Sequence, residues 1–499
     1  MAPKLLPPPA SALMQSIRGV GYETRTAVAD LIDNSITAGA STVWLEFRWN
    51  GRDSTVTLLD DGRGMGPDEL DRAMTLGSRS PLEQRSATDL GRFGLGLKTA
   101  SLSQCSRLLV ASKVTQKDVQ TRVWDLALVR DTDQWLVEDG PAGSEADLLQ
   151  PLGAMASGTL VVWRNLDRLV GDASTDDAKA RLDFQRTSRE VEAHLGMVFH
   201  RFLEGTRPRL RLYVNGRSEE FRVKPWDPFL TGHPSTQQMP EVRRGGSAGT
   251  VLLQGFVLPH RDRFDGDEYE AAAGPAGWTS QQGFYVYRAQ RLLVPGSWLG
   301  LGKPKRWMRD EQHKLARIRL DLPNTLDANW NIDVKKSAAL PPLELRDWLT
   351  RNAEGIRTAA REVYVHRGSP LPTGARAAFS PAWLSGSGNS PAYLINRAHP
   401  VVAELLSGSP TQKALVERAL RLLETTVPVH RIWLDVSESP ESPASTSQLL
   451  DSATVEKLAK DLLARLEAGQ KMSRANALDV LRLTEPFDQF PAIIASLTT

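Results

Sequence analysis

The stretch "DLGRFGLGLKTASL", residues 89–102, combines three glycines with a lysine and then continues into good helix-forming residues. Gly91, Gly94 and Gly96 give the pattern G-x-x-G-x-G, which Lys98 follows. A Walker loop reads G-x-x-x-x-G-K-[ST] and a dinucleotide-binding turn reads G-x-G-x-x-G, so this run is neither. Alone it is more typical of a flexible loop or a tight packing turn. The free N–H groups at the start of a helix nevertheless suit phosphate oxygens.

A second segment, "TRTAVADLIDNSITAGA" at residues 24–40, has the apolar spacing of a helix, with Gly39 as a C-terminal stop. Asp30 and Asn34 lie four residues apart within it, so they share one face of the predicted helix. That face lies opposite the apolar stripe, and we expect it to look into a cleft. An isolated pair of this kind carries little information, because most such pairs are simply solvated.

Two further elements complete the pattern. The segment "DDGRGM", residues 60–65, ends a predicted strand, and its glycines allow a tight turn and the close approach of a ligand. Gly158 and Thr159 stand at the head of another predicted strand. Each of the four elements is weak evidence alone, but all four in this order and spacing are strong evidence for one nucleotide site.

The composition sets limits on the class of protein. A chain of 499 residues is too long for one ordinary core, so two or three domains are expected. The formal charge of +2 does not demand nucleic acid, and the single cysteine excludes an internal disulfide and a structural zinc site. The N-terminus is too rich in proline for a secretory signal, and no run of eighteen apolar residues predicts a membrane span. We therefore expect a soluble, cytoplasmic protein.

The chain divides into three predicted regions. Residues 1–175 alternate helical and strand patterns, including an expected strand over "TRVWDLALV" at residues 121–129. Residues 176–365 begin with a polar helix, continue with several strands and close with a helix over "LELRDWLTRNAEGIRTAAREVYVH". A Pro/Gly/Ser-rich linker then leads into residues 366–499, which are mainly helical. The predicted fold class is α/β.

Read together, the four elements resemble the GHKL ATPases, which include gyrase B subunits, the ninety-kilodalton heat-shock chaperones, histidine kinases and MutL. The resemblance covers about residues 16–166. It implies a Bergerat-type α/β sandwich in which ATP lies between helices and sheet under a mobile lid, here residues 75–94. It also implies that Asn34 holds the Mg²⁺ that bridges the phosphates, since Mg²⁺ prefers oxygen ligands and keeps several waters.

The resemblance assigns the remaining nucleotide contacts. The Asp60 carboxylate accepts a hydrogen bond from the exocyclic amine of adenine, and Thr159 supports it through hydrogen bonds. Asp61 is expected to have a structural role. Gly62 and Gly64 shape the adenine pocket, Gly91, Gly94 and Gly96 line the triphosphate, and Lys98 adds a charge there. Met65 and Leu97 complete the implied ATP-binding set.

One position departs from the family pattern. GHKL enzymes that hydrolyse ATP usually carry glutamate four residues before the asparagine, where it activates the attacking water. Here that residue is Asp30, whose side chain is one methylene shorter. A displacement of ~1 Å can cost ~100-fold in rate, so we expect Asp30 to act as the general base of a slow ATPase. Glu23, almost two turns earlier, is a poor substitute.

The second region resembles a transducer domain. The segment "GFYVYRAQRLLV", residues 283–294, resembles a strand pair of MutL- and MORC-type proteins. "NWNIDVKKSAALPP", residues 329–342, resembles the segment whose lysine reaches the γ-phosphate; Lys336 fits that role best and Lys335 next. The plainer alternative is a surface lysine pair at the end of a strand. A histidine-kinase reading is disfavoured, because only about fifteen proline-rich residues precede the domain.

Within this branch the phrases "DLIDNS" and "GRFGLGLK" are most similar to MORC ATPases and their bacterial relatives, over about residues 10–345. The resemblance implies an ATP-gated homodimeric clamp that closes on DNA, associated in bacteria with phage defence and with other proteins of a defence operon. Basic stretches favour DNA, although charged loops are usually just solvated faces: Arg243, Arg244, Lys303, Lys305 and Arg306. The alternative is a chaperone-like ATPase that remodels a polypeptide. No resemblance assigns a role to residues 366–499.

Overall fold

The computed structural model spans residues 1–499. It describes residues 8–19, 21–77, 96–141, 145–246, 249–323, 330, 339–365, 380–385, 393–429, 431–432, 452–469 and 472–497. The chain divides into two compact units, Met1–Val365 and His366–Thr499. Each unit is described by itself below.

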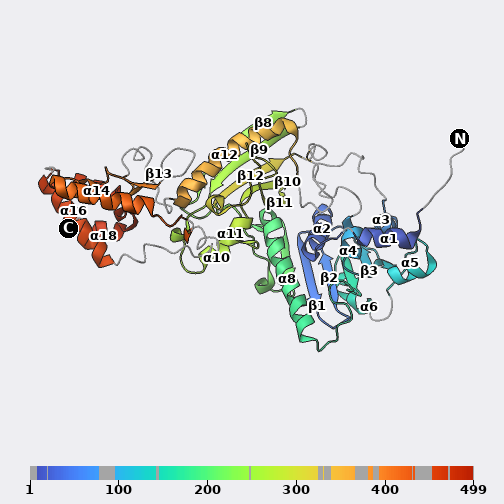
Figure 1. Ribbon diagram of the computed structural model, residues 1–499. Coiled ribbons are helices and arrows are strands. Elements are labelled where there is room, and N and C mark those ends of the chain that lie inside the picture. The colour runs from blue at the N-terminus through green and yellow to red at the C-terminus, as the bar shows by residue number, and fades with distance from the viewer. Residues whose placement is uncertain are drawn as a thin grey trace, which may run out of the picture. The chain divides into compact units, whose positions relative to one another are not determined.

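A mixed sheet forms the first layer of the N-terminal unit (Figure 1). Its strand order is β4-β3-β5-β2-β1-β6, and all neighbours are antiparallel except β1 and β6. The strands are β1 (Thr42–Arg48), β2 (Thr55–Asp60), β3 (Arg107–Lys113), β4 (Gln120–Asp125), β5 (Gly158–Arg164) and β6 (Arg211–Val214). We call this the first sheet.

Helices accompany the first sheet along the chain. They are α1 (Ala10–Arg18), α2 (Thr24–Thr37), α3 (Pro67–Met74), α4 (Gly96–Leu102), α5 (Leu126–Thr132), α6 (Glu145–Leu148), α7 (Gln150–Gly153), α8 (Ala178–Val198) and α9 (His200–Leu203). Helix α2 packs against both α4 and α8. Its buried residues include Val28, Leu31 and Ile32, which belong to the core cluster that also holds Val43, Leu45 and Leu58 of the sheet.

The opposite face of the first sheet is also covered. Leu59, Leu109 and Val162 point into a second apolar cluster, which Leu148 and Leu152 of α6 and α7 close. Layers on both faces make this part an α/β sandwich. The strand ends that carry the predicted adenine contacts therefore lie between buried layers.

A second sheet follows, with strand order β11-β10-β12-β9-β7 and β8 paired to β9. Its strands are β7 (Gln237–Gln238), β8 (Val242–Gly246), β9 (Gly249–Val257), β10 (Gly283–Arg288), β11 (Arg291–Ser297) and β12 (Ala316–Leu322). Short helices α10 (Glu268–Ala273) and α11 (Gly277–Ser280) precede β10, and the long helix α12 (Leu343–Val365) packs against β9 and β12. Helical turns of 3₁₀ type occur at Glu219–Phe221, Arg261–Arg263 and Glu311–His313.

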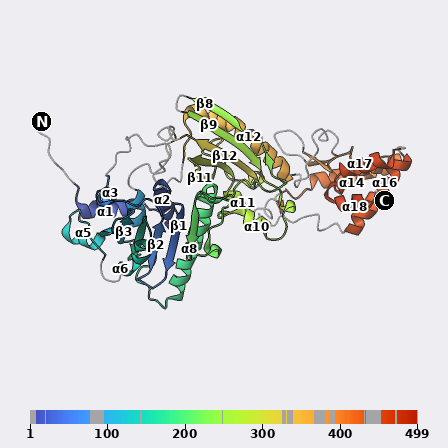
Figure 2. The same cartoon turned by 180° about the vertical axis from the view of Figure 1, so that it is seen from behind.

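The two sheets share apolar packing. Helix α8 contacts both α2 and β11, and it lies between the first sheet and the β10–β11 strands in both views (Figures 1 and 2). Tyr285, Tyr287 and Leu292 of the second sheet belong to the same core cluster as α2. Side chains of β10 and β11 are therefore held at fixed positions against the first-sheet layer.

The C-terminal unit is mainly helical. Strands β13 (Trp383–Ser385) and β14 (Tyr393–Ile395) form a small antiparallel pair. The helices are α13 (Pro400–Leu405), α14 (Pro410–Thr425), α16 (Ser452–Gly469), α17 (Arg474–Arg482) and α18 (Pro491–Ser496), with a 3₁₀ turn at Phe487–Gln489. A core around Leu463, Leu478 and Phe487 joins α16, α17 and α18.

The α/β architecture and the helical C-terminal region confirm the sequence predictions, with one correction. The strand expected over residues 121–129 ends at Asp125, and α5 begins directly after it. The Asp125 carboxylate accepts the N–H of Ala127, so it caps the first turn of the helix and stops the strand. The boundary placed after residue 175 stays a prediction, although β6 extends the first sheet well beyond it. Among the described residues no helix has both the length and the apolar character to span a membrane.

Candidate nucleotide site

Asp60 ends β2 as a buried carboxylate with fixed partners. It is only 4 % exposed, Ser35 Oγ of α2 donates to its Oδ2 at 2.8 Å, and the Gly62 N–H donates to its Oδ1 at 2.9 Å. Burial raises the pKa of Asp60, while hydrogen bonds from Ser35, Gly62 and Thr159 oppose the rise. These bonds fix the orientation of the carboxylate and leave each oxygen with capacity to accept another hydrogen bond.

Glycines allow unusually close contacts around the end of β2. A Cβ at Gly62 would lie 2.9 Å from Asp60 Oδ1, and one at Gly158 would lie 2.2 Å from the Asp60 carbonyl oxygen. Gly64 has φ +70°, and its Cβ would lie 2.0 Å from the carbonyl oxygen of Lys113. These contacts require glycine, because a side chain would displace neighbouring backbone. The turn after β2 is therefore packed closely against Lys113 at the end of β3.

A hydroxyl pair joins this turn to the neighbouring strands. Ser112 Oγ on β3 lies 3.0 Å from Thr159 Oγ1 on β5, and it accepts the N–H of Met65 at 2.8 Å. Thr159 pairs with Asp60 across the β2–β5 ladder. The structure therefore places Asp60, Gly62, Gly64, Met65 and Thr159 together, and their role in ATP binding stays a prediction.

Asp61 faces away from this group. Its carboxylate accepts the N–H groups of Ser41 and Thr42 at 2.7 and 2.8 Å and the Ser41 hydroxyl at 2.6 Å. These bonds fix the start of β1, which agrees with the expected structural role.

The polar face of α2 carries the catalytic candidate. Asp30 is 5 % exposed, and its Oδ2 accepts the hydroxyl of Tyr22 at 3.1 Å. Asn34 stands one turn further along the same face and is exposed. A Cβ built on Gly96, the first residue of α4, would lie 3.8 Å from Asp30 Oδ2, so the predicted base adjoins the glycine-rich segment.

Lys98 is placed differently from a simple phosphate contact. Its side chain is buried, and its ammonium donates to the carbonyl oxygens of Ala73 and Thr75 at 2.8 Å each, next to the end of α3. Burial lowers its pKa to about 8. Leu97 is partly buried against the main core. A phosphate contact by Lys98 stays a prediction that requires the ammonium to leave these carbonyls.

The remaining predicted residues lie outside the described part of the chain. These are Gly91 and Gly94, most of the expected lid at residues 75–94, and both candidate lysines, Lys335 and Lys336. Their roles stay predictions.

Four functional candidates were missed from the sequence: Tyr22, Ser35, Ser112 and Arg291. Tyr22, Ser35 and Ser112 touch Asp30 or the Asp60 group as described above. Arg291 lies on β11, and its Nε donates to both carboxylate oxygens of Asp33 at 3.1 Å. Only Arg291 had a sequence signal, because it falls within the transducer-like segment 283–294.

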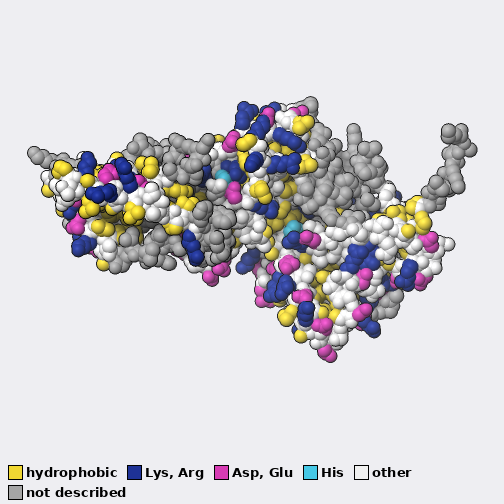
Figure 3. All heavy atoms as spheres, in the orientation of Figure 1, with side chains coloured by type: hydrophobic (Ala, Val, Ile, Leu, Met, Phe, Trp, Pro, Cys, Tyr) yellow, Lys and Arg dark blue, Asp and Glu magenta, His cyan; other side chains and the backbone are white. Residues whose placement is uncertain are grey.

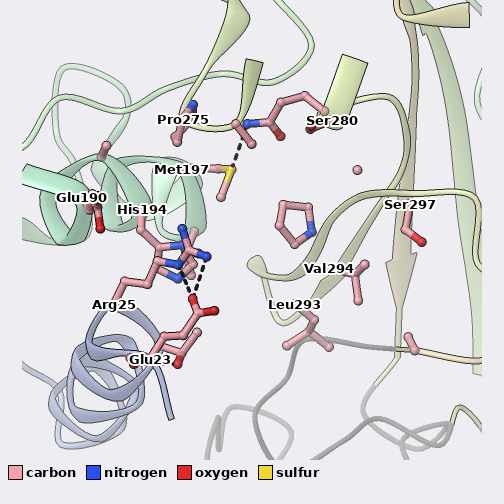
Figure 4. Close-up of a pocket in the computed structure, with 18 of the residues that line it drawn as sticks. Glu23, Arg25, Glu190, His194, Met197, Pro275, Ser280, Leu293, Val294 and Ser297 are labelled. Carbon is pink, nitrogen blue, oxygen red and sulfur yellow. Dashed lines mark hydrogen bonds and ion pairs between the residues drawn. The ribbon is translucent and has the colours of Figure 1, made fainter. Parts of the chain in front are cut away.

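A cavity of about 830 Å³ lies beside this site and is distinct from the Asp60 group. Figure 4 shows Glu23 and Arg25 from the start of α2, His194 and Met197 from α8, and Leu293 from the strand region of the second sheet around it. Arg291 also lines this cavity, whereas the predicted ATP-binding and catalytic residues that the structure describes do not. Burial, with the nearby charges of Arg291 and Arg25, lowers the pKa of His194 to about 3, so its imidazole is neutral at physiological pH.

Comparison with known proteins gives this geometry a context. Residues 22–159 match the family described as histidine kinase-, DNA gyrase B-, and HSP90-like ATPase. The chain is 28 % identical over 226 residues to the DNA mismatch repair protein MutL of Rhodospirillum rubrum, covering 42 % of this chain and 31 % of that protein. It is 25 % identical over 325 residues to Protein MICRORCHIDIA 6 of Arabidopsis thaliana, covering 54 % and 46 % of the two chains.

These alignments are partial, since the chain spans less than half the length of either relative. A solved structure described as the N-terminal domain of a DNA repair protein overlaps 72 % of this chain, with a TM-score of 0.41 and 13 % identity. The family match begins at Tyr22 and ends at Thr159, and it includes Asp30, Asn34 and Asp60. Residues 22–159 therefore belong to the histidine kinase-, DNA gyrase B- and HSP90-like ATPases, in a chain that is similar to MutL and MICRORCHIDIA proteins.

Proposed function

We propose that this chain binds Mg-ATP, hydrolyses it slowly and uses the nucleotide to close a homodimeric clamp. The observation that carries the proposal is the buried Asp60 carboxylate, fixed by Ser35 and Gly62 in a turn whose close backbone contacts require glycine. A carboxylate there accepts the exocyclic amine of adenine, and Gly62 and Gly64 allow the base to approach the backbone. The family match over the same residues supports this assignment.

Residues of α2 supply the proposed chemistry at the triphosphate end of the ATP site. Asp30 accepts a proton from the attacking water, and the Tyr22 hydroxyl orients its carboxylate. The exposed amide of Asn34, one turn away, fits a single oxygen ligand of a hydrated Mg²⁺, which supplies charge neutralisation at the phosphates. Gly91, Gly94 and Gly96 offer backbone N–H groups to the triphosphate, and Lys336 reaches the γ-phosphate from the second region.

The proposed clamp acts on DNA. One relative is named a DNA mismatch repair protein, and Figure 3 shows Lys and Arg side chains gathered over the part of the N-terminal unit that carries β8, β9 and α12. Two of the five predicted basic residues form exposed ion pairs, Arg243 with Glu241 and Lys303 with Asp347. Lys305 and Arg306 are exposed and form no ion pair among the described residues.

A role in phage defence with operon partners, in the cytoplasm, rests on the family resemblance alone.

Two measurements test this function. Purified protein with Mg-ATP should release phosphate slowly, and chelation of Mg²⁺ should stop the release. Light scattering should show a compact dimer with a non-hydrolysable ATP analogue but not with ADP, because only a ligand that binds the closed state better can shift the equilibrium. An unchanged mass and shape with the analogue would contradict the clamp.

The substrate is tested separately by titrating double-stranded DNA at several salt concentrations. Contacts to phosphates release counterions, so affinity should fall steeply as salt rises. Replacing Lys305 and Arg306 with alanine should reduce this salt dependence, whereas replacing the ion-paired Lys303 should change it less. Absence of DNA binding in the analogue-bound dimer, together with binding of unfolded polypeptide, would favour the chaperone-like alternative.

A further inference from the structure

Arg291 reaches from the second sheet into the catalytic end of the proposed site. It begins β11 directly after a two-residue turn, Ala289 and Gln290, both of which have positive φ. Arg288 and Arg291 pair across this turn, so the hairpin fixes the backbone position of Arg291. Arg291 as a whole is 5 % exposed.

The guanidinium lies between two acidic side chains of α2. Its Nε donates to both oxygens of Asp33 at 3.1 Å, and its Nη2 lies 4.0 Å from Asp30 Oδ1. Asp33 and Asp30 are 1 % and 5 % exposed, so three charged groups are buried together. Removing one member of such a cluster leaves an uncompensated buried charge, so its geometry is strongly constrained.

The two oxygens of Asp30 consequently face different parts of the chain. Oδ2 faces the Tyr22 hydroxyl and the backbone at Gly96, whereas Oδ1 faces Arg291 of the second sheet. Asp30 and Asp33 lie three residues apart on one helix, so a cation that holds Asp33 also limits the rotation of the helix face that carries Asp30. A short aspartate in place of glutamate makes the reaction more sensitive to this placement.

We propose that Arg291 is a positioning residue for ATP hydrolysis. Through its hydrogen bonds to Asp33, it holds Asp30 within reach of the attacking water. The rate of hydrolysis then depends on the position of the second sheet relative to α2. The inference rests on the proposed ATPase function. It assigns to the second sheet a contact with the base side of the site, separate from the lysine expected at the γ-phosphate.

A second ion pair provides a matched control. Arg201 of α9 pairs with Asp321 of β12 at 2.5 Å, and its guanidinium also lies 3.5 Å from the centroid of the Tyr287 ring. This pair joins the same two layers, but it does not touch Asp30 or Asp33. Arg201→Lys therefore measures what a weakened interlayer ion pair does without a change at the base.

The experiment measures kcat and KM for Mg-ATP in Arg291→Lys, Asp33→Asn, Arg201→Lys and the unaltered protein, with circular dichroism to check folding. Lysine keeps the charge of Arg291 but lacks its planar fork. We expect kcat to fall about 10- to 100-fold in Arg291→Lys, with KM within about 2-fold, because the base is displaced while the adenine contacts are intact. Asp33→Asn should show the same split, and Arg201→Lys should retain kcat.

Equal kcat in Arg291→Lys and the unaltered protein would overturn the inference and leave the ATPase proposal standing. Equal losses in Arg291→Lys and Arg201→Lys would also overturn it, because they indicate a general effect of interlayer packing. If Arg291→Lys fails to fold, Asp33→Asn provides the test instead. A fall in kcat with nearly constant KM supports the inference, and an unchanged kcat overturns it. Absence of ATP turnover in the unaltered protein would overturn the proposed function and this inference together.

Discussion

The hydrogen-bond partners of Asp60 come from the first-sheet layer, whereas Asp30 also faces an arginine from the second sheet. Ser35 lies on α2, Gly62 lies in the turn after β2, and Thr159 pairs with Asp60 from the neighbouring strand β5. Asp30 instead lies between Tyr22, Gly96 and Arg291, which belong to three separate segments. If the proposed roles of Asp60 and Asp30 hold, nucleotide affinity and turnover depend on different parts of the fold, so they should respond to different substitutions.

The largest effect is expected at the catalytic end. Asp30→Asn removes the proton acceptor but keeps the size of the side chain. We expect kcat to fall about 100-fold or more, the usual contribution of a general base, while the affinity for ATP is nearly unchanged. Phosphate release gives kcat and calorimetry gives the affinity. Glu23→Gln is the control for the alternative base, and a loss of turnover there with none in Asp30→Asn would transfer the role to Glu23.

The adenine end should show the opposite pattern. Asp60→Asn replaces one carboxylate oxygen with an NH₂ group, which cannot accept a hydrogen bond from the adenine amine. A buried polar group left without its hydrogen bond costs ~1–3 kcal/mol, so affinity for ATP should fall about 5- to 150-fold. The adjacent Asp61→Asn is a matched control, because Asp61 bonds only to the start of β1 among the contacts described above. Calorimetry that shows equal affinity in Asp60→Asn and the unaltered protein would reject the adenine assignment.

The turn after β2 offers a structural test of the same end. Gly64 and Gly77 both have left-handed φ, +70° and +67°, but only at Gly64 would a Cβ meet backbone, at 2.0 Å from Lys113 O. Gly77→Ala should lower the free energy of unfolding by about 1–2 kcal/mol, the cost of that conformation alone. Gly64→Ala should lower it further and also weaken ATP binding. Equal losses in a denaturant titration would show that the close approach is unimportant.

A smaller effect is expected at the lysine pair. Lys336→Ala should keep nucleotide affinity but slow turnover and closure by about 5-fold or more, the lower end of typical coupling between sites. Lys335→Ala is the matched control one residue away. A larger effect of Lys335→Ala on turnover would assign the γ-phosphate contact to Lys335 instead.

Much of this site was predictable because its signals are local. Helical spacing placed Asp30 and Asn34 on one face, and the position of Asp60 at a strand end before two glycines indicated the turn that we propose for adenine. The contacts that fix these groups were not predictable, because they join distant parts of the chain: Ser112 bonds to Met65 across 47 residues, and Arg291 to Asp33 across 258. Sequence spacing also could not show that the Lys98 ammonium bonds to carbonyls near the end of α3, since that depends on how α3 and α4 meet.

The fold shows the same division. Strands and helices with clear periodicity formed where they were expected, since period and burial agree within each segment. The end of β4 was missed because the apolar run after Asp125 continues without a break, and only the capping bond of Asp125 separates strand from helix. Local side-chain bonding of this kind competes with the pattern of apolar residues and is weakly visible in it.

Single-turnover hydrolysis at saturating Mg-ATP tests the central claim most directly, because saturation removes differences in affinity. The unaltered protein, Asp60→Asn and Asp30→Asn are compared under the same conditions. If the adenine end serves binding and Asp30 serves chemistry, Asp60→Asn should approach the rate of the unaltered protein, while Asp30→Asn should stay about 100-fold slower. Hydrolysis by Asp30→Asn at the rate of the unaltered protein, or a rate in Asp60→Asn that saturation does not restore, would contradict the account.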